Sequence, residues 1–345
     1  MEYRCAFVGC GPRAHGHAQA YSLITRGRPV ACCDLDPERL DAFGDRYGIA
    51  GRYTDLDVML AAEHPDLVHL VTKPDLRVPL MSRLAEASVP AVLVEKPVCV
   101  ETGDYKALRR LEANSATKFA VNLQLRHHPL ILEFLEEVRA HSVGDVRFID
   151  ASAGLPVAGQ GVHILDLMFA FAGYAPVERV VGIASGYDDI DGTHPSPNTM
   201  TAVVTFANGI RGVLQAGEGY PVFEPDPAVW MHKRIAVCGT HGYLHWRMAG
   251  WERSLPDRTV ARGPNDYAAQ DLRGQAALTE ALLGWVADDS AVAPTNLGTA
   301  LDEWLVVLAC YESALRARPV DLPFSPPDDL LTRYRQWVGG SEPTD

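Results

Sequence analysis

The chain has 345 residues, of which 47% are hydrophobic and 22% charged, a composition that excludes wholesale disorder and predicts about two globular domains. Its formal net charge of -13 argues against nucleic acid or an anionic membrane surface as a partner. The sequence contains no apolar run long enough for a membrane span, and its first residues lead us to expect no secretory signal. The seven cysteines form no metal-binding pattern, so we expect reduced thiols, no metal site and a cytoplasmic location.

Short apolar runs alternate with helical patterns over the first 120 residues. Strands are predicted at 4–8, 29–33, 67–72, 91–94 and 119–121. Helices are predicted from residue 14 to about 26 and over 37–47, 76–87 and 102–113. Strands separated by helices of this length indicate βαβ units and a parallel sheet, and so an α/β N-terminal domain.

Strands dominate after about residue 122. They are predicted at 146–153, 177–185, 200–206, 210–215, 234–238 and 243–246, with a hairpin turn at 207–209. Helices are predicted at 129–140, 162–171, 270–287 and 296–317. Segments 188–197 and 221–227 and the chain after residue 323 are expected to be irregular. This pattern indicates an α+β second domain, so we predict domains at 1–122 and 123–345.

A dinucleotide-binding fingerprint follows the first predicted strand. Gly9-x-Gly11-x-x-Ala14 lies between that strand and a helix, which is the context that the motif requires. The first glycine permits the tight turn, and the second lets the backbone approach a pyrophosphate. The helix N-terminus, with Pro12 and Arg13 in its first turn, offers unpaired N–H groups to the phosphates.

An acidic residue, Asp34, ends the second predicted strand. A carboxylate at that point can accept hydrogen bonds from the adenosine ribose and would repel a 2′-phosphate, which favours NAD over NADP. The alternative role is to cap the helix that begins at Pro37, although Asp36 could supply that cap instead.

A lysine follows the apolar strand that ends at Val94, within Glu95-Lys96-Pro97. Ligands of parallel α/β sheets bind at the carboxyl ends of the strands, so the Lys96 amine is expected to face the cofactor crevice. Partial burial and a nearby nicotinamide cation would lower its pKa, which suits a group that hydrogen-bonds a reacting hydroxyl. Taken alone, Lys96 is better interpreted as a surface lysine at a strand end.

In combination with Gly161-Val162-His163-Ile164-Leu165-Asp166, these motifs resemble the Gfo/Idh/MocA family of NAD(P)-dependent oxidoreductases over about residues 3–325. The resemblance implies an N-terminal Rossmann domain with a parallel sheet and a C-terminal α+β domain with a large open, mostly antiparallel sheet. It implies hydride transfer between the cofactor and a sugar, inositol or related cyclic polyol, in a homodimer or homotetramer. It also implies that Lys96 and His163 flank the reacting hydroxyl as catalytic groups.

Further site residues follow from the resemblance. It places Asn122 near the nicotinamide and the substrate, and Glu95 near the nicotinamide ribose. Lys73, which precedes Pro74, could reach the cofactor or point into solvent. His127 is a further candidate for contact with the substrate, as is Gln160.

Three positions depart from the family pattern. Gly159 stands where the family usually carries an aspartate that completes the acid/base relay, and Lys73 and Val78 replace a threonine and a histidine. Two alternatives follow: Lys96 and His163 suffice for catalysis, or another group replaces the aspartate, with Gln160, Asp166, Arg126 and His127 as candidates.

A third alternative is that catalysis is lost. The chain would then be a non-catalytic NAD(H)-binding regulator. A different enzyme also remains open, one that recycles NAD internally for glycoside cleavage or epimerisation.

Overall fold

The computed structural model describes residues 2–186, 194–220, 232–257 and 259–339. Two compact units make up the chain, and neither is continuous in sequence. The first contains Met1–Cys99, Asp104–His127 and Asp271–Leu301, and the second contains Val100–Gly103, His128–Gln270 and Asp302–Asp345. The predicted boundary after residue 122 stays a prediction.

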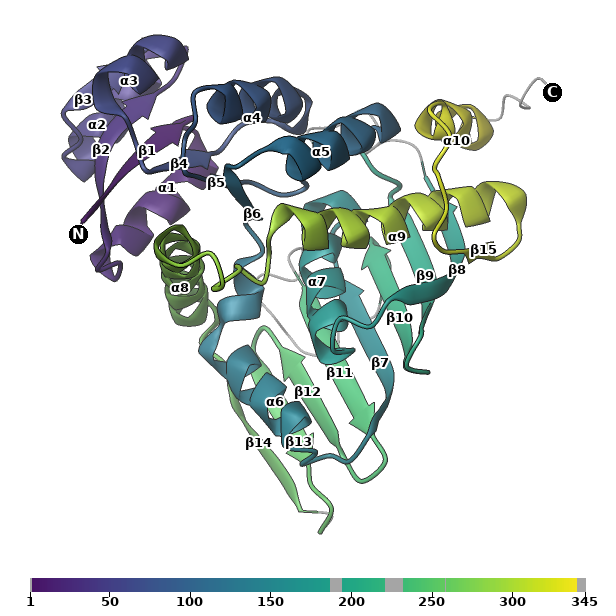
Figure 1. The fold of residues 1–345 in the computed structure, drawn as a ribbon. Helices are drawn as coiled ribbons and strands as arrows, with labels where there is room; N and C mark the ends of the chain where they lie inside the picture. Colours follow the sequence, from purple (N-terminus) through teal and green to yellow (C-terminus); the bar gives the residue numbers. More distant parts are fainter. Residues whose placement is uncertain (1, 187–193, 221–231, 258, 340–345) are drawn as a thin grey trace. The chain divides into compact units, whose positions relative to one another are not determined.

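A six-stranded parallel sheet with the order β3-β2-β1-β4-β5-β6 forms the first unit (Figure 1). Its strands are β1 (Tyr3–Val8), β2 (Gly27–Cys33), β3 (Gly51–Tyr53), β4 (Leu67–Leu70), β5 (Ala91–Val94) and β6 (Lys118–Val121). Its α-helices are α1 (Pro12–Gln19), α2 (Pro37–Tyr47), α3 (Leu56–Glu63), α4 (Arg77–Glu86), α5 (Thr102–Asn114) and, from Asp271 onward, α8 (Tyr267–Ala287). Its 3-10 turns are η1 (Ala20–Ser22), η2 (Pro74–Leu76) and η3 (Gln124–His127). The predicted N-terminal Rossmann domain with a parallel sheet is confirmed.

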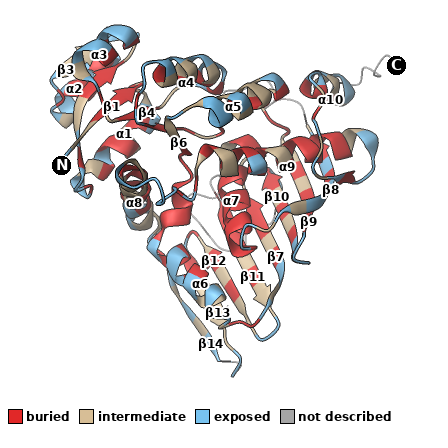
Figure 2. Ribbon diagram, in the orientation of Figure 1, coloured by how far each residue is buried: buried red, intermediate tan, exposed pale blue. Residues whose placement is uncertain are grey.

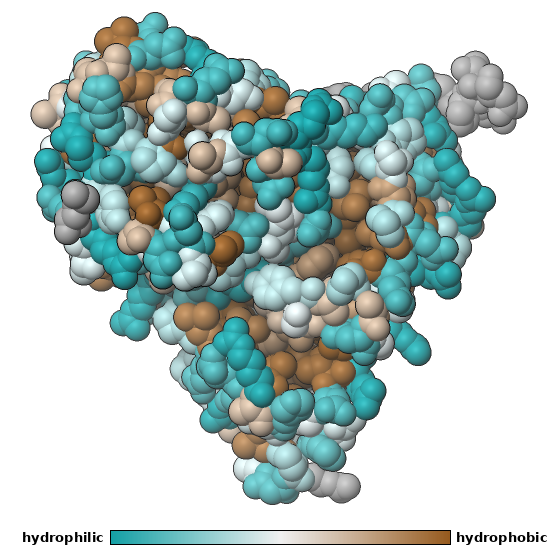
Figure 3. All heavy atoms as spheres, in the orientation of Figure 1, coloured by the Kyte–Doolittle hydropathy of each residue, from teal (hydrophilic) through white to brown (hydrophobic). Residues whose placement is uncertain are grey.

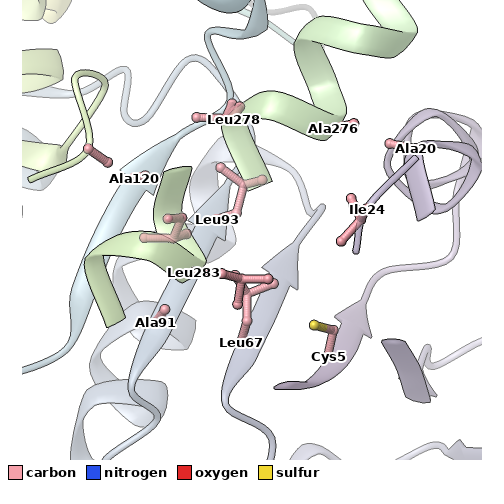
Figure 4. Packing of buried hydrophobic residues seen from close by; sticks show 12 residues of the cluster. Cys5, Ala20, Ile24, Leu67, Ala91, Leu93, Ala120, Ala276, Leu278 and Leu283 are labelled. Atoms are coloured by element: carbon pink, nitrogen blue, oxygen red, sulfur yellow. The ribbon is translucent and has the colours of Figure 1, made fainter. Parts of the chain in front are cut away.

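Helix α8 supplies part of the core of this unit although it lies some 150 residues after the last strand. The central strands β4 and β5 are buried along their whole length, as expected for parallel strands covered on both faces. Figure 4 shows Leu278 and Leu283 of α8 among the apolar side chains of the sheet. The buried cluster consists of Cys5, Ala20, Ile24, Leu67, Ala91, Leu93, Ala120, Ala276, Leu278, Leu282, Leu283 and Ala293.

The second unit is built on a nine-stranded sheet with the order β14-β13-β12-β11-β7-β10-β9-β8-β15. Its strands are β7 (Val146–Ala153), β8 (Val177–Ser185), β9 (Thr199–Phe206), β10 (Arg211–Gly217), β11 (Lys233–Gly239), β12 (Tyr243–Arg247), β13 (Gly250–Ser254), β14 (Val260–Pro264) and β15 (Val320–Asp321). Its helices are α6 (Pro129–Arg139), the π-helical turn η4 (Val157–Gly161), α7 (Val162–Phe171), α9 (Leu297–Arg316, from Asp302 onward) and α10 (Leu330–Val338). Every strand pair except β7–β10 is antiparallel, which confirms the predicted mostly antiparallel sheet.

Helices cover one face of this sheet. Every residue of α7 is buried (Figure 2), and a Cβ at Gly212 of β10 would lie 2.3 Å from the sulfur of Met168, so glycine is needed where α7 packs on the strand. Strand β8 alternates buried and exposed residues, the pattern of a sheet with one face covered. Its outward side chains include Ile183, which is 70% exposed.

Several predicted elements differ from those observed. The helix predicted to about residue 26 ends at Gln19, and η1 follows it. The sequence analysis missed β3, α3, β13 and β14. Strand β3 is only three residues long, most of β13 is half-buried, and β14 is largely exposed, so these strands carry little apolar alternation. The expectation that the chain after residue 323 is irregular was wrong for α10 (Leu330–Val338), where Leu330, Leu331 and Tyr334 are buried. Of the other segments expected to be irregular, 221–227 and 188–193 lie outside the described residues.

The face of the molecule in Figure 3 is largely hydrophilic, and hydrophobic residues reach it in separate areas. Among the described helices, none is long and apolar enough to cross a membrane. All seven cysteines are free thiols, and all but Cys238 are buried.

Candidate active site

The turn between β1 and α1 leaves open space beside its backbone. Gly9 has φ of +90°, and a Cβ there would lie 2.3 Å from the carbonyl oxygen of Val71, so only glycine fits. Gly11 caps α1 without a side-chain hydrogen bond, and Pro12 opens the helix. No neighbouring atom lies within 4 Å of the position that a Cβ of Gly11 would take. This geometry fits a pyrophosphate group bound at a helix N-terminus.

The next two residues of the fingerprint point in different directions. Ala14 is fully buried in a cluster with Phe7, Cys32 and Phe43, which fixes α1 against the sheet. The Arg13 side chain is partly exposed, and its Nε donates to Glu95 Oε1 at 2.8 Å.

Asp34, at the end of β2, is held by the backbone of the turn. Its carboxylate accepts from the N–H of Cys10 at 2.8 Å and from that of Asp36 at 2.9 Å, and its side chain is only 8% exposed. Asp36 caps α2 by accepting from the N–H of Arg39, so the cap role considered for Asp34 belongs to Asp36. The Arg39 guanidinium also lies 3.4 Å from Asp34.

Three donors converge on one oxygen of Glu95 at the end of β5. Its Oε1 accepts from Arg13 Nε at 2.8 Å, His17 Nε2 at 2.8 Å and Asn122 Nδ2 at 2.7 Å. The other oxygen, Oε2, accepts from the backbone N–H of Lys96 at 3.1 Å. Burial opposes ionisation of this carboxyl group, but Arg13, His17 and Lys96 outweigh burial and hold its pKa well below its ordinary value. Glu95 is therefore a buried carboxylate.

The Lys96 amine is shifted toward its neutral form. Burial is the largest cause and lowers its pKa from 10.5 to about 8, with Arg13 and Arg77 acting in the same direction and Glu95 opposing them. Arg77 is itself buried, and its Nη2 donates to the carbonyl oxygens of Thr72 at 3.0 Å and Lys96 at 3.2 Å. These bonds connect the segments that directly follow β4 and β5.

Asn122 lies directly after β6 and is fully buried. Its amide nitrogen donates to Glu95, while its Oδ1 has no hydrogen-bond partner among the described residues. A buried acceptor without a partner is costly, so this oxygen is suited to a donor group of a bound cofactor or substrate. His127 is buried at the end of η3 in the same unit.

Lys73 and Pro74 lie at the end of β4, where η2 begins. Pro74 is buried and Lys73 is exposed at the N-cap of η2. The structure does not bring the Lys73 amine into the group around Glu95.

The remaining predicted site residues lie in the second unit. Gln160 is in η4, and His163 is the second residue of α7 and only 3% exposed. The Gln160 Oε1 accepts from the buried ammonium of Lys233 at 3.1 Å, and this ammonium lies 4.8 Å from the centre of the Tyr267 ring. A Cβ at Gly159 would meet only Leu155, at 3.5 Å.

Comparison with known proteins adds an independent observation. Residues 3–123 match the family GFO_IDH_MocA, described as an oxidoreductase family with an NAD-binding Rossmann fold. Over these residues the chain resembles the Gfo/Idh/MocA oxidoreductases.

Curated proteins resemble this chain over most or part of its length. A D-apiose dehydrogenase from Rhizobium rhizogenes is 24% identical over 354 residues, which cover 93% of this chain and 98% of that protein. A D-apiose dehydrogenase from Paraburkholderia graminis is 27% identical over 229 residues, which cover 61% of this chain and 60% of that protein. The second match thus spans less than two thirds of the relative's own length.

Solved structures share the fold. An oxidoreductase from Agrobacterium radiobacter in complex with NAD+, L-tartaric acid and magnesium superposes with a TM-score of 0.80 at 21% identity, covering 93% of this chain and 98% of that one. A levoglucosan dehydrogenase in complex with NADH superposes with a TM-score of 0.79 at 15% identity, covering 94% of this chain and 100% of that one. These likenesses agree with the sheets described above.

The sequence analysis missed three buried polar residues. His17 and His69 are fully buried in the first unit, where they connect Glu95 to Tyr21, and Lys233 is buried in the second. A histidine inside the apolar strand 67–70 is a signal that could have identified His69. The lysine at the start of the apolar strand 233–239 is a similar signal, because buried charges need polar partners.

Proposed function

We propose that the chain is an NAD-dependent oxidoreductase that acts on a secondary hydroxyl or keto group of a sugar, inositol or related cyclic polyol. The observation that carries this proposal is the half-buried Lys96, whose backbone N–H donates to the Glu95 carboxylate and whose amine has a pKa lowered to about 8. The names of the D-apiose dehydrogenase relatives support a sugar substrate.

Each cofactor contact is assigned to residues whose geometry fits it. Gly9, Gly11 and the first turn of α1, which includes Pro12 and Arg13, would hold the pyrophosphate. Asp34 would accept from the adenosine ribose, which favours NAD over NADP. The bound nicotinamide supplies the hydride acceptor or donor.

The catalytic roles rest on the family resemblance and on the chemistry of the side chains. Lys96 would hydrogen-bond the substrate oxygen, and His163 would exchange its proton. Asn122 Oδ1 would accept from the nicotinamide or the substrate, with His127 and Gln160 as further substrate contacts. Residues 1–122 would then bind the cofactor, and residues 123–345 would bind the substrate and form oligomer contacts.

The test is nicotinamide absorbance with a panel of inositols, sugars including D-apiose, and their keto forms. NAD and NADP are compared in both reaction directions. Turnover with NAD, and much less with NADP, is the expected result. If no member of the panel gives a signal, mass spectrometry of cofactor released from the purified protein separates the alternatives.

Gly159 keeps the alternative functions open. Glycine supplies no acid or base where the family resemblance implies an aspartate, so a non-catalytic NAD(H)-binding regulator is the second candidate. The space around Gly159 admits a Cβ, so Gly159→Asp can be made without a backbone clash. Turnover that appears only in this variant would favour the regulator, and tightly bound NAD(H) without net turnover would favour internal recycling.

The pKa of Lys96 predicts opposite pH profiles for the two reaction directions. Below about pH 8 the ammonium form predominates, and above it the free amine does. Oxidation needs a group that accepts a proton, so kcat/KM for oxidation should rise as pH increases through about 8, and kcat/KM for reduction should fall. Profiles that are flat across this range in both directions would remove Lys96 from the acid/base role.

We further propose that the chain is a homodimer or homotetramer formed through the outward face of its nine-stranded sheet. Phe148, Val181, Ile183 and Val203 are exposed on this face, and contiguous apolar surface of this kind marks an interface. Ile183→Glu is expected to reduce the mass measured by light scattering to the 37.6 kDa of one chain. Val260→Glu, a matched change on β14, should leave the assembly intact, and a monomeric wild type would contradict the proposal.

A further inference from the structure

A chain of hydrogen bonds runs through the interior of the first unit and ends at Glu95. The Tyr21 hydroxyl lies 2.7 Å from His69 Nε2, His69 Nδ1 lies 3.0 Å from His17 Nδ1, and His17 Nε2 lies 2.8 Å from Glu95 Oε1. Both histidines are fully buried. The four residues come from η1, β4, α1 and the end of β5, so only the folded sheet brings them together.

The donor and acceptor at each link can be assigned. An ionised carboxylate only accepts, so His17 Nε2 must carry a hydrogen and donate to Glu95. If His17 is neutral, its Nδ1 is an acceptor, so His69 Nδ1–H donates to it. His69 Nε2 is then an acceptor for the Tyr21 hydroxyl. All three hydrogen bonds therefore donate in the same direction, toward the carboxylate.

A charged His17 would reverse the first two links of this chain. Its Nδ1–H would donate to His69, and His69 would donate to the Tyr21 oxygen. Burial disfavours that charge and lowers the pKa of His17 despite the neighbouring Glu95, and it lowers the pKa of His69 further. Arg13 already supplies one cation to the same Glu95 oxygen. Asn122 Nδ2 lies 3.1 Å from His17 Nε2 because both groups donate to that oxygen.

The rings of the chain are held by packing as well. The His69 ring stacks on Phe7 at 4.8 Å with an interplanar angle of 12°, and Tyr21 meets the edge of Phe7 at 6.0 Å. The Tyr21–Phe change would therefore remove one hydroxyl and keep the aromatic contacts. The role of these hydrogen bonds can therefore be tested by a small substitution.

We propose that Tyr21, His69 and His17 are positioning residues for Glu95. Their aligned hydrogen bonds hold the carboxylate on the backbone N–H of Lys96, and the negative charge held there supports the ammonium form of Lys96. The consequence for turnover rests on the proposed function, whereas the hydrogen-bond chain itself does not.

The charges that face this region come from several elements. Lys96 is faced by Glu95, by Arg13 of α1 and by Arg77 of α4. His17 is also faced by Asp271 of α8. Tyr21 is faced by Cys5 of β1 and Glu280 of α8. Tyr21→Phe alters none of these charges, so a shift in the Lys96 pKa would result from the loss of the Tyr21 hydrogen bond.

The first experiment is nitrogen-15 NMR of the histidine side chains in the protein without substrate. The expected result is that His17 is neutral with its hydrogen on Nε2 and that His69 is neutral with its hydrogen on Nδ1, at pH 7. In Tyr21→Phe, a second tautomer of His69 should appear. A charged His17, or His69 with its hydrogen on Nε2 in the wild type, would overturn the proposal.

The second experiment follows the ε-carbon of Lys96 by carbon-13 NMR as pH is varied. The chain has only five lysines, and the Lys96 signal is assigned by its loss in Lys96→Met. Because Glu95 supports the ammonium, Tyr21→Phe should lower the Lys96 pKa by roughly half a unit, the size expected for one weakened hydrogen bond. His69→Phe, which keeps a ring against Phe7, should lower it at least as much.

The matched control is Tyr47→Phe. The Tyr47 hydroxyl also lies 3.0 Å from a histidine nitrogen, that of His15, in the same unit but outside the chain. In this variant the Lys96 pKa should equal that of the wild type. An unchanged Lys96 pKa in Tyr21→Phe would overturn the positioning role. Both experiments need no substrate, so a silent substrate panel would count against the proposed function and leave the chain of hydrogen bonds to be decided by NMR.

Discussion

Replacing Lys96 with methionine is expected to lower turnover by roughly a hundred- to ten-thousandfold, the usual contribution of a general acid–base group. Methionine has a similar length and can occupy the half-buried position, but it carries no proton to exchange. Burial, Arg13 and Arg77 lower the pKa of the wild-type Lys96 amine to about 8, and the variant has no group that titrates there. NADH binding should change little, because the Lys96 contacts with Glu95 and Arg77 are made by its backbone.

The measurement combines steady-state kinetics with NADH fluorescence titration. Lys106→Met, the same change on helix α5, is the matched control and should keep wild-type turnover. Turnover of Lys96→Met near that of the wild type would remove this residue from the catalytic role. Loss of NADH binding in the same variant would instead assign Lys96 to the cofactor site.

Alanine at the two glycines of the dinucleotide turn is expected to separate folding from cofactor binding. Gly9→Ala must place a Cβ 2.3 Å from the Val71 carbonyl oxygen at φ of +90°, so the free energy of unfolding should fall. The cost should be at least about 1 to 3 kcal/mol, the range for one strained backbone position. Gly11→Ala meets no neighbouring atom and should fold normally. Its methyl group would fill the space assigned to the pyrophosphate and should weaken NAD binding strongly.

Urea unfolding and calorimetric titration with NAD measure the two effects separately. Gly16→Ala, within α1, is the control because its Cβ would lie 3.6 Å from the nearest side-chain atom, Arg13 Nη1. It should gain about 0.5 to 1 kcal/mol of stability from helix propensity and bind NAD normally. Normal NAD binding by Gly11→Ala would show that the pyrophosphate does not bind at this turn.

The local sequence was sufficient to predict the elements that carry a strong periodic pattern. Helix α2 has the predicted bounds because Asp36 caps it and Pro37 opens it, both within the same few residues. Strand β5 also has the predicted bounds, because an apolar run of four residues is followed directly by Glu95. Weak patterns failed: β14 is exposed along much of its length, and α10 buries only a few of its side chains.

For the candidate site, too, the sequence predicted some features and missed others. The positions of Gly9 and Lys96 at the ends of strands follow from sequence order, because parallel strands place their carboxyl ends at one edge of the sheet. Their roles in binding and catalysis stay predictions. The sequence analysis did not anticipate the partners of Glu95, because His17 precedes it by 78 residues and belongs to a different element.

By itself, the sequence determined the order of βαβ units, the dinucleotide turn and the position of a lysine after an apolar strand. These features depend on residues within a few positions of each other, so local sterics and hydrophobic periodicity specify them. Only the tertiary structure decided that α8 completes the first core, that Glu95 is a buried carboxylate with three donors on one oxygen, and that Tyr21 connects to it through two histidines. Those features depend on which distant side chains share a buried space, and the free energy of burying a polar group is determined by the partners that the fold supplies.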